Sequence, residues 1–178
     1  AYPTWGTDTG DHRGDGRWPA LTEAGRPARL AVMAGHRARL EGFADDPLTA
    51  DESVDRAILL GEIDKVVFDE SILRAEAWDP LQTVYLVGGG LFSVLAREYA
   101  PWSERGAALL ARIEGLPELF SAALDALTGL PDRPVGLLQL ETALGRRPGV
   151  TDLLDASVTE AMRRAGAGAA PELVGPLE

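Results

Sequence analysis

Apolar residues recur with the period of an α-helix from Leu21 almost to the end of the chain, and proline corners interrupt this pattern. Two such corners are Asp79-Pro80 and Leu116-Pro117. The residue before a proline is driven out of the helical region, so each corner predicts a helix end. No segment shows the alternation of apolar and polar residues that is typical of a half-buried strand. We therefore expect an all-α fold, built as an irregular antiparallel helical assembly.

The first two helices have the clearest boundaries. The first, about 22–43, contains Pro27, which a helix tolerates in its first turn because the missing N–H would have no helical partner there. The second begins after Thr49, whose spacing from Glu52 is that of a capping box, and runs to about residue 78. Its apolar residues cover more than one stripe, so we expect burial on several sides, as at the centre of a bundle.

The second half of the chain is expected to hold shorter helices. Breaks are predicted at the triple glycine 88–90 and at Pro148-Gly149, because glycine and proline both disfavour helix interiors. The expected helices are 91–99, 102–115, 118–127, 134–146 and 150–165.

Composition divides the chain into three parts. Residues 1–20 form a polar arm rich in glycine and aspartate, residues 21–165 form the helical domain, and residues 166–178 form an Ala-, Gly- and Pro-rich tail or truncation point. The arm has no apolar period, so we expect an extended or looped segment. Its aromatic residues are expected to anchor it against helices: Tyr2, Trp5 and Trp18.

Charge and cysteine content exclude several classes of protein. The chain has 28 acidic and 17 basic residues, a net charge of -11, which repels nucleic acid and anionic lipid. It has no cysteine and two histidines, which excludes a disulfide scaffold, thiol catalysis and a zinc finger. No stretch approaches the ~18 apolar residues of a spanning helix. We expect no nucleic-acid or membrane partner and a cytoplasmic location, and Ala1 in place of Met leaves N-terminal processing open.

The arm concentrates the polar residues that could contact a ligand. A calcium loop starting at Asp11 fails, because Arg13 and Thr22 occupy positions that require oxygen ligands. His12 lacks the second histidine or thiolate that zinc usually takes. Two interpretations remain: a turn-rich arm whose side chains satisfy local backbone groups, or a ligand-contacting loop. The candidate substrate-binding residues are His12, Arg13 and Asp15, and we assign no catalytic residue and no metal ligand to this chain.

Five motifs in order along the chain resemble one known family. They are Pro3-x-Trp5-Gly-x-x-x-Gly10-x-His12-Arg13 with Asp15 and Trp18, then Trp78-Asp79-Pro80-Leu81, Ala96-Arg97-Glu98-Tyr99-Ala100-Pro101, Arg112-Ile113-Glu114-Gly115-Leu116-Pro117, and Glu141-Thr142-Ala143-Leu144 followed by Gly149. Together they are similar to the N-terminal third of the bacterial helical proteins known as domain of unknown function 885.

The resemblance carries functional expectations. Members of that family resemble zinc metallopeptidases, with a His-Glu-x-x-x-x-His-His type element and a further acidic ligand far downstream, and no segment of this sequence matches that element. The chain is then the N-terminal, non-metal-binding segment of a zinc-dependent hydrolase acting on peptides or small amides, and it forms part of the substrate-cleft wall. Zinc is expected in the C-terminal part, so this chain alone is expected to be inactive.

The expected partner is that C-terminal part of the same protein or a second subunit. Within the cleft, Arg13 would hold a substrate carboxylate by a paired hydrogen bond and His12 would donate to a carbonyl or orient a neighbour. The alternative is a non-catalytic acidic helical module that binds a basic protein partner.

Overall fold

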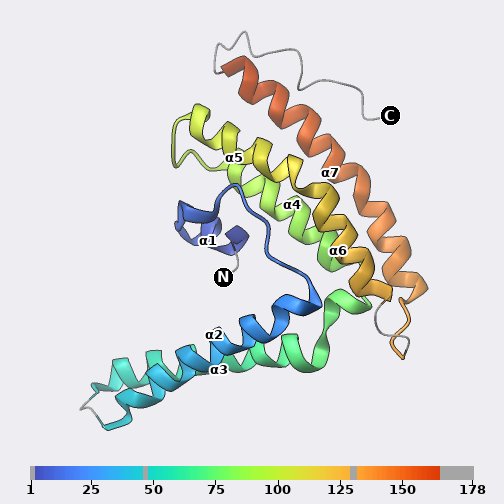
Figure 1. The fold of residues 1–178 in the computed structure, drawn as a ribbon. Helices are drawn as coiled ribbons and strands as arrows, with labels where there is room; N and C mark the ends of the chain where they lie inside the picture. The colour runs from blue at the N-terminus through green and yellow to red at the C-terminus, as the bar shows by residue number, and fades with distance from the viewer. Residues whose placement is uncertain (1–2, 46–47, 129–131, 165–178) are drawn as a thin grey trace. The chain divides into compact units, whose positions relative to one another are not determined.

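The computed structural model describes residues 3–45, 48–128 and 132–164 (Figure 1). In these ranges every regular element is a helix, which confirms the predicted all-α class. The α-helices are α1 (Pro3–Thr9), α2 (Arg26–Glu41), α3 (Ala50–Phe68), α4 (Leu81–Ala96), α5 (Trp102–Glu114), α6 (Leu116–Thr128) and α7 (Leu137–Arg164). The predicted tail, 166–178, and Tyr2 lie outside the described residues.

The chain divides into two compact units. The first comprises Ala20–Gln82 and Glu118–Leu140. The second comprises the described parts of Tyr2–Pro19 and Glu141–Glu178 together with Thr83–Pro117. Each unit is made from segments that are distant in the sequence.

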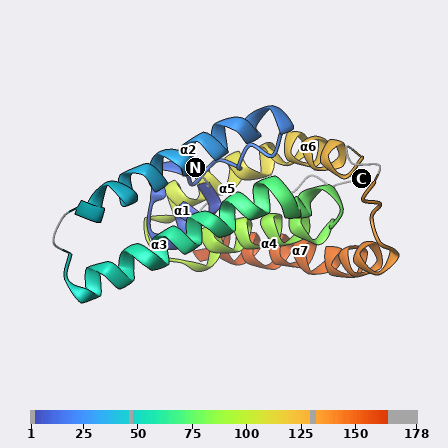
Figure 2. The same ribbon diagram turned by 90° about the horizontal axis from the view of Figure 1, so that it is seen from below.

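In the first unit, α2 and α3 lie side by side as an antiparallel hairpin, as both views show (Figures 1 and 2). Pro27 stands in the first turn of α2, as predicted. The capping box that begins α3 is also confirmed: Glu52 N–H donates to Thr49 Oγ1 at 3.3 Å, and Thr49 N–H donates to Glu52 Oε2 at 2.7 Å. Both features are local, so the sequence was sufficient to predict them.

The expectation that this second helix is buried on several sides is wrong for the described chain. Ile63 is its only buried residue in the described ranges, whereas Val54, Ile58 and Phe68 are 57%, 58% and 47% exposed. At 3.6 residues per turn these three side chains share one stripe on the side opposite to Ile63. We call Val54, Ile58 and Phe68 the α3 apolar stripe. Apolar character predicts a tendency to be covered, and the packing of α3 within the first unit leaves these three side chains about half exposed.

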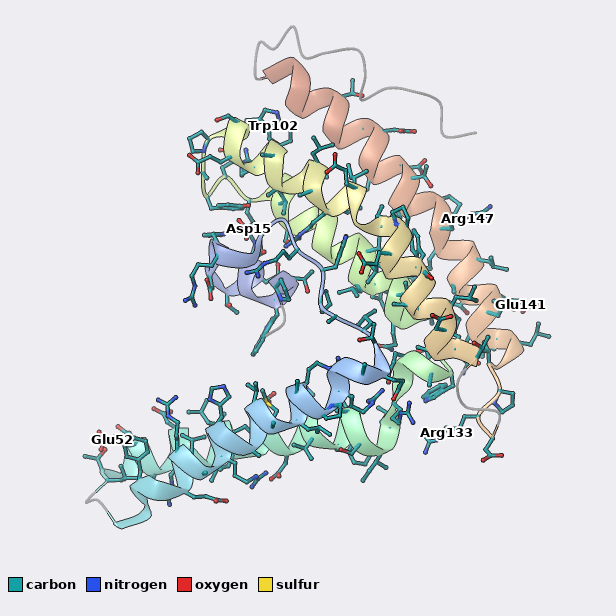
Figure 3. All side chains as sticks on the ribbon, viewed as in Figure 1. Asp15, Glu52, Trp102, Arg133, Glu141 and Arg147 are labelled. Atoms are coloured by element: carbon teal, nitrogen blue, oxygen red, sulfur yellow. The ribbon has the colours of Figure 1, made fainter. Side chains whose placement is uncertain are left out.

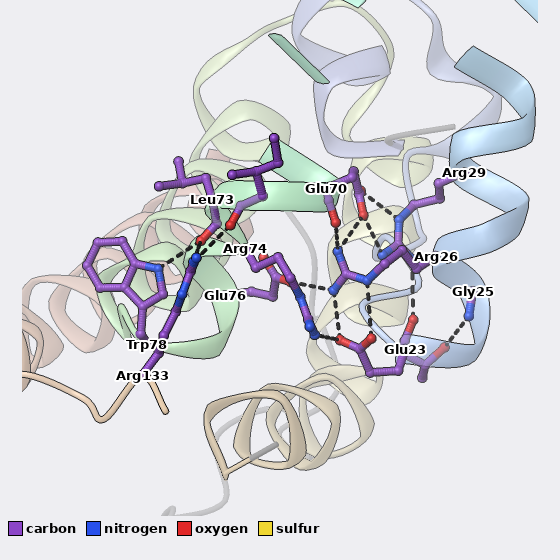
Figure 4. Close-up of polar contacts among 12 residues, drawn as sticks. Glu23, Gly25, Arg26, Arg29, Glu70, Leu73, Arg74, Glu76, Trp78 and Arg133 are labelled. Atoms are coloured by element: carbon purple, nitrogen blue, oxygen red, sulfur yellow. Dashed lines mark hydrogen bonds and ion pairs between the residues drawn. The ribbon is translucent and has the colours of Figure 1, made fainter. Parts of the chain in front are cut away.

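A cluster of three arginines and three glutamates holds the end of α3 against the start of α2 (Figure 4). We call this set the arginine–glutamate cluster: Glu23, Arg26, Arg29, Glu70, Arg74 and Glu76. Its centre is Glu70, which pairs with Arg26 at 3.1 Å and with Arg29 at 2.7 Å. The pKa of Arg26 is raised, chiefly by its hydrogen bond to Glu23 and also by Glu76. The pKa of Glu23 is lowered, chiefly by its hydrogen bond to Arg26.

Helix α3 is followed by a π-helical turn, Asp69–Leu73, which leads to Arg74 of the arginine–glutamate cluster. Arg74 then adopts a left-handed conformation with φ 47°, which is uncommon for a residue other than glycine. Its guanidinium pairs with Glu23, and its backbone N–H donates to Asp69 O at 2.8 Å. Arg133 donates to the carbonyls of Ile72 and Leu73 at 2.8 and 2.7 Å, so the turn is held from a second side.

In the second unit, α4 runs without interruption through the triple glycine, so the predicted break there is wrong. The physical reason is a close approach. A Cβ added at Gly90 would lie 2.5 Å from Cζ3 of Trp18, so this position needs a residue without a side chain. Packing of the indole outweighs the roughly 1 kcal/mol by which glycine disfavours a helix interior.

The predicted break at Pro148-Gly149 is also wrong, because α7 continues past it. Contacts with α4 flank the proline. Arg146 lies over the ring of Tyr85 at 5.9 Å, and a Cβ at Gly88 would lie 3.6 Å from Val150. Packing on both sides of Pro148 holds the two halves in line despite the lost backbone hydrogen bond.

Candidate functional site

The arm is folded, in contrast to the extended or looped segment expected from its composition. Helix α1 is followed by a 3-10 turn at His12–Gly14, and Gly10 joins them with a positive φ of 92°. Asp11 caps the turn, because its Oδ1 accepts the backbone N–H of Arg13 at 3.2 Å. The seven residues of α1 are too few to show a helical period, which is why sequence reasoning missed this helix.

Trp18 anchors the arm in the second unit, as predicted. Its Nε1 donates to the Arg112 carbonyl at 2.7 Å, and its ring packs closely against Gly90 and Gly115. Trp5 is 66% exposed, so the anchoring role expected for it is wrong within the described chain.

Asp15 lies in the arm (Figure 3). It is buried, and both of its carboxylate oxygens have partners. Thr7 Oγ1 donates to Oδ1 at 2.7 Å, and Nδ1 of His12 lies 3.1 Å from Oδ2. Thr7 is itself fully buried, and its hydroxyl is also 3.2 Å from the carbonyl of Pro3. The carboxylate oxygens of Asp15 therefore bind side chains of the arm itself.

Arg112 continues this network from α5. Its side chain is fully buried, its Nη2 donates to Thr7 Oγ1 at 2.8 Å, and its Nη1 donates to the Gly90 carbonyl. Its guanidinium carbon lies 5.6 Å from the centre of the Trp18 ring, a cation–π contact. Burial lowers the pKa of Arg112, because the charged form loses its hydration. In the described ranges no carboxylate contacts the Arg112 nitrogens directly, and the Thr7 hydroxyl links Arg112 to Asp15.

Tyr99 lies flat against His12. The ring centres are 3.8 Å apart and the planes differ by 9°, so the imidazole is held on one face. Within the described part of the chain, the Tyr99 hydroxyl is buried without a hydrogen-bond partner. Burial, with a smaller contribution from Asp15, raises the pKa of Tyr99 to about 12. The His12 side chain remains 36% exposed.

Arg13 projects away from this network and is 88% exposed. Its guanidinium pairs with the Asp11 carboxylate through two hydrogen bonds of 2.7 and 2.6 Å. These hydrogen bonds lower the pKa of Asp11 to about 2. The structure thus brings together two of the three candidate residues, His12 and Asp15, and leaves Arg13 at the surface.

Sequence reasoning did not single out Thr7, Tyr99 or Arg112 as members of this site. Tyr99 and Arg112 do stand in two of the family-like motifs, which was the available signal. Their role depends on contacts between residues that are distant in sequence, since Thr7 and Arg112 are 105 positions apart. We call Thr7, His12, Asp15, Tyr99 and Arg112 the arm network.

Two features are absent from the described residues, a metal-binding cluster and a membrane-spanning helix. No group of three or more histidine, cysteine, aspartate or glutamate side chains is placed to hold a metal ion in these ranges. None of the helices that the structure describes has the length and apolarity needed to cross a membrane.

Comparison with protein families identifies the chain. A family model described as "Bacterial protein of unknown function (DUF885)" matches residues 3–172. The chain belongs to the DUF885 family. No curated protein matches the sequence.

A solved structure similar to this DUF885 chain is described as that of a candidate lipoprotein of unknown function from Shewanella oneidensis. The two share 26% sequence identity with a TM-score of 0.80. The match covers 96% of this chain and 30% of the Shewanella chain. This DUF885 chain therefore spans about a third of the length of the structure it resembles.

Proposed function

We propose that this chain is the N-terminal, non-metal-binding segment of a zinc-dependent, metallopeptidase-like hydrolase that acts on peptides or small amides. It forms part of the wall of the substrate cleft, and the zinc with its ligands belongs to the C-terminal part. The observation that carries this proposal is the match of nearly the whole chain to 30% of a related chain. The chemistry comes from the resemblance of the DUF885 family to zinc metallopeptidases.

The exposed apolar residues support association with a larger part. The three side chains of the α3 apolar stripe, Val54, Ile58 and Phe68, are 57%, 58% and 47% exposed in the described chain. Val54 and Ile58 lie one turn apart, and exposed apolar side chains that gather on one helix face mark protein interaction sites. We therefore assign this stripe to contact with the C-terminal part of the protein or with a second subunit.

At the cleft, Arg13 is the group that would bind a substrate carboxylate. Its present partner, Asp11, forms an exposed surface pair, and such pairs contribute little to stability. A ligand carboxylate with the same two-point geometry can therefore replace Asp11. Asp15 supports this surface from within, by holding His12.

The cytoplasmic location also remains a prediction. The Shewanella relative is described as a candidate lipoprotein, so the two proteins need not share a compartment. Cell fractionation with an antibody against this chain tests the prediction, and its recovery with the membrane fraction would contradict it.

The function is tested by producing this chain with and without the downstream part encoded at the same locus. Alone, the chain should bind no stoichiometric zinc and hydrolyse no peptide. The assembled protein should bind zinc and cleave peptides or small amides. Zinc-dependent hydrolysis by this chain alone would contradict the proposal, and assembly without zinc or hydrolysis would favour the alternative, a non-catalytic interaction module with an acidic surface.

The interface is tested separately by sedimentation of the two parts. Ile58→Asp places a charge in the α3 apolar stripe and should weaken their association. Ser53→Asp is the control, because Ser53 is exposed on α3 but lies outside the stripe. Equal association of both variants with the downstream part would show that the stripe is not the interface.

A further inference from the structure

We propose that His12 binds a ligand as a hydrogen-bond acceptor, through the lone pair of Nε2, and that Asp15 is the positioning residue that sets this polarity. The ligand group it fits is an N–H, such as that of an amide or of a peptide backbone. This inference rests on the proposed function for the identity of the ligand. It reverses the role expected from the sequence, in which His12 donates to a carbonyl.

The polarity follows from the direction of the hydrogen bonds in the arm network. Arginine can only donate, so Arg112 donates to the Thr7 oxygen at 2.8 Å. The single hydroxyl proton of Thr7 then has two possible acceptors, Asp15 Oδ1 at 2.7 Å and Pro3 O at 3.2 Å. The shorter distance and the carboxylate acceptor both favour Asp15. Oδ1 of Asp15 therefore accepts a hydrogen bond from the Thr7 hydroxyl.

The second oxygen of Asp15 determines the tautomer of His12. Oδ2 lies 3.1 Å from Nδ1, and a carboxylate can only accept. A neutral imidazole carries one N–H and one lone pair, so its proton is on Nδ1 and its lone pair is on Nε2. The negative charge of Asp15 is already linked, through Thr7, to the buried positive charge of Arg112. Asp15 therefore has a partner for its charge inside the network even where His12 is neutral.

The lone pair is also presented to a ligand. Tyr99 covers one face of the imidazole at 3.8 Å and holds its plane. Nδ1 faces Asp15, and Nε2 makes no hydrogen bond with any residue that the structure describes. With the side chain 36% exposed, the edge that carries Nε2 remains available.

The test is nitrogen NMR of the imidazole rings in the 178-residue chain. The chain has two histidines, so His36→Gln assigns the signals. Spectra are recorded at increasing pH until they no longer change, so that only the neutral form of each ring is compared. We expect His12 to show a protonated Nδ1 and an unprotonated Nε2, and the exposed His36 to show an average of both tautomers. A protonated Nε2 in His12, or an average like that of His36, would overturn the proposal.

Two aspartate variants separate positioning from charge. Asp15→Asn introduces an amide that can donate to Nδ1, so the proton should shift to Nε2. Asp11→Asn makes the same charge change next to His12 and should leave the tautomer unchanged. A tautomer that is indifferent to Asp15→Asn in a folded chain would contradict the role of Asp15. If Asp15→Asn unfolds the chain, the wild-type tautomer still decides the polarity.

Accessibility of the lone pair is tested with diethyl pyrocarbonate, which acylates unprotonated imidazole nitrogens. Mass spectrometry should find His12 modified at Nε2 at a rate comparable to that of exposed His36. Protection of His12 would overturn the proposal, because a ligand N–H needs the same access. None of these measurements needs zinc, substrate or the downstream part. Their failure would leave the proposed hydrolase role intact, and failure of that role would not alter the tautomer.

Discussion

The guanidinium of Arg112 donates to the hydroxyl of Thr7 across 105 positions of sequence, at 2.8 Å and in the buried interior of the second unit. This contact joins α1 to α5. Through the Thr7 hydroxyl it links the positive charge of Arg112 to the carboxylate of Asp15. A buried charge is stable when a partner compensates it, so the Thr7 hydroxyl is a structural requirement of the arm.

Thr7→Val keeps the shape of the side chain and removes the hydroxyl that links Arg112 to Asp15. Both groups then lose a buried hydrogen bond, and the free energy of unfolding should fall by about 1–3 kcal/mol. Urea unfolding followed by circular dichroism measures it. Thr9→Val is the matched control on the same helix, because Thr9 is exposed, and should change stability by less than about 0.5 kcal/mol. Equal effects of the two variants would show that the buried link contributes nothing specific.

Gly90→Ala should destabilise the chain, because the new methyl group would lie 2.5 Å from the Trp18 ring. Overpacking of this kind costs about 1–3 kcal/mol and should also change the fluorescence of Trp18. Gly89→Ala, one position earlier in α4, meets no atom within 4 Å. That variant should stabilise the helix by up to about 1 kcal/mol. Opposite signs for neighbouring substitutions are the expected result, and destabilisation by both would contradict the close approach of Trp18.

Glu70→Gln should weaken the arginine–glutamate cluster, because the Glu70 carboxylate pairs with both Arg26 and Arg29. Its side chain is largely buried, and hydrogen bonds to charged groups contribute about 1.5–3 kcal/mol, so a loss of that order is expected. The control is Glu62→Gln, since Glu62 forms an exposed pair with Lys65 at 3.8 Å. Chemical denaturation of both variants measures the difference. A fall in the free energy of unfolding of less than about 0.5 kcal/mol for Glu70→Gln would contradict a stabilising role of the arginine–glutamate cluster.

The phenol of Tyr99 should lose its proton at a higher pH than an ordinary tyrosine does. Its pKa is raised to about 12 from an ordinary 10.0, so the folded chain holds the phenol proton more tightly than the unfolded chain. This contribution to stability is fully present below pH 10 and declines as the pH rises toward 12. The rise of tyrosinate absorbance with pH should include a step near pH 12, and Tyr99→Phe should remove that step. A wild-type titration with no component above the ordinary range would contradict the burial of the hydroxyl.

Arg13→Ala tests the arm in the assembled protein with the peptide that it cleaves. Loss of about 1.4 kcal/mol of binding would raise KM about tenfold, and kcat should change little. Arg13 is exposed, so helix content should be unchanged. Arg39→Ala, at an exposed position of α2, is the control and should leave KM unchanged. An unaltered KM in the Arg13 variant would assign the arm a structural role.

Local features of the fold could be predicted from the sequence. The capping box at Thr49, the position of Pro27 in α2 and the corner at Pro117 each depend on residues within one turn of a helix. Such signals act through backbone geometry and nearby hydrogen bonds, so they need no knowledge of the partner. The helical class follows from their repetition.

The site depended on contacts that the sequence does not encode locally. His12 and Asp15 were identified as candidates from their residue types. The sequence could not show that Asp15 faces Nδ1, or that Nε2 has no hydrogen-bond partner among the described residues. Thr7, Tyr99 and Arg112 join them only after the chain folds, since Tyr99 stacks on His12 from a distant segment.

By itself, the sequence determined that this chain is helical, acidic and a member of its family, because helix starts, charge and motif order are properties of neighbouring residues or of the chain as a whole. The tertiary structure decided where helices continue through glycine and proline, which apolar stripe stays exposed on α3, and which way the His12 ring presents its lone pair. Those outcomes depend on packing between residues far apart in sequence. Trp18 against Gly90 and Thr7 against Arg112 are contacts that only the folded chain brings together.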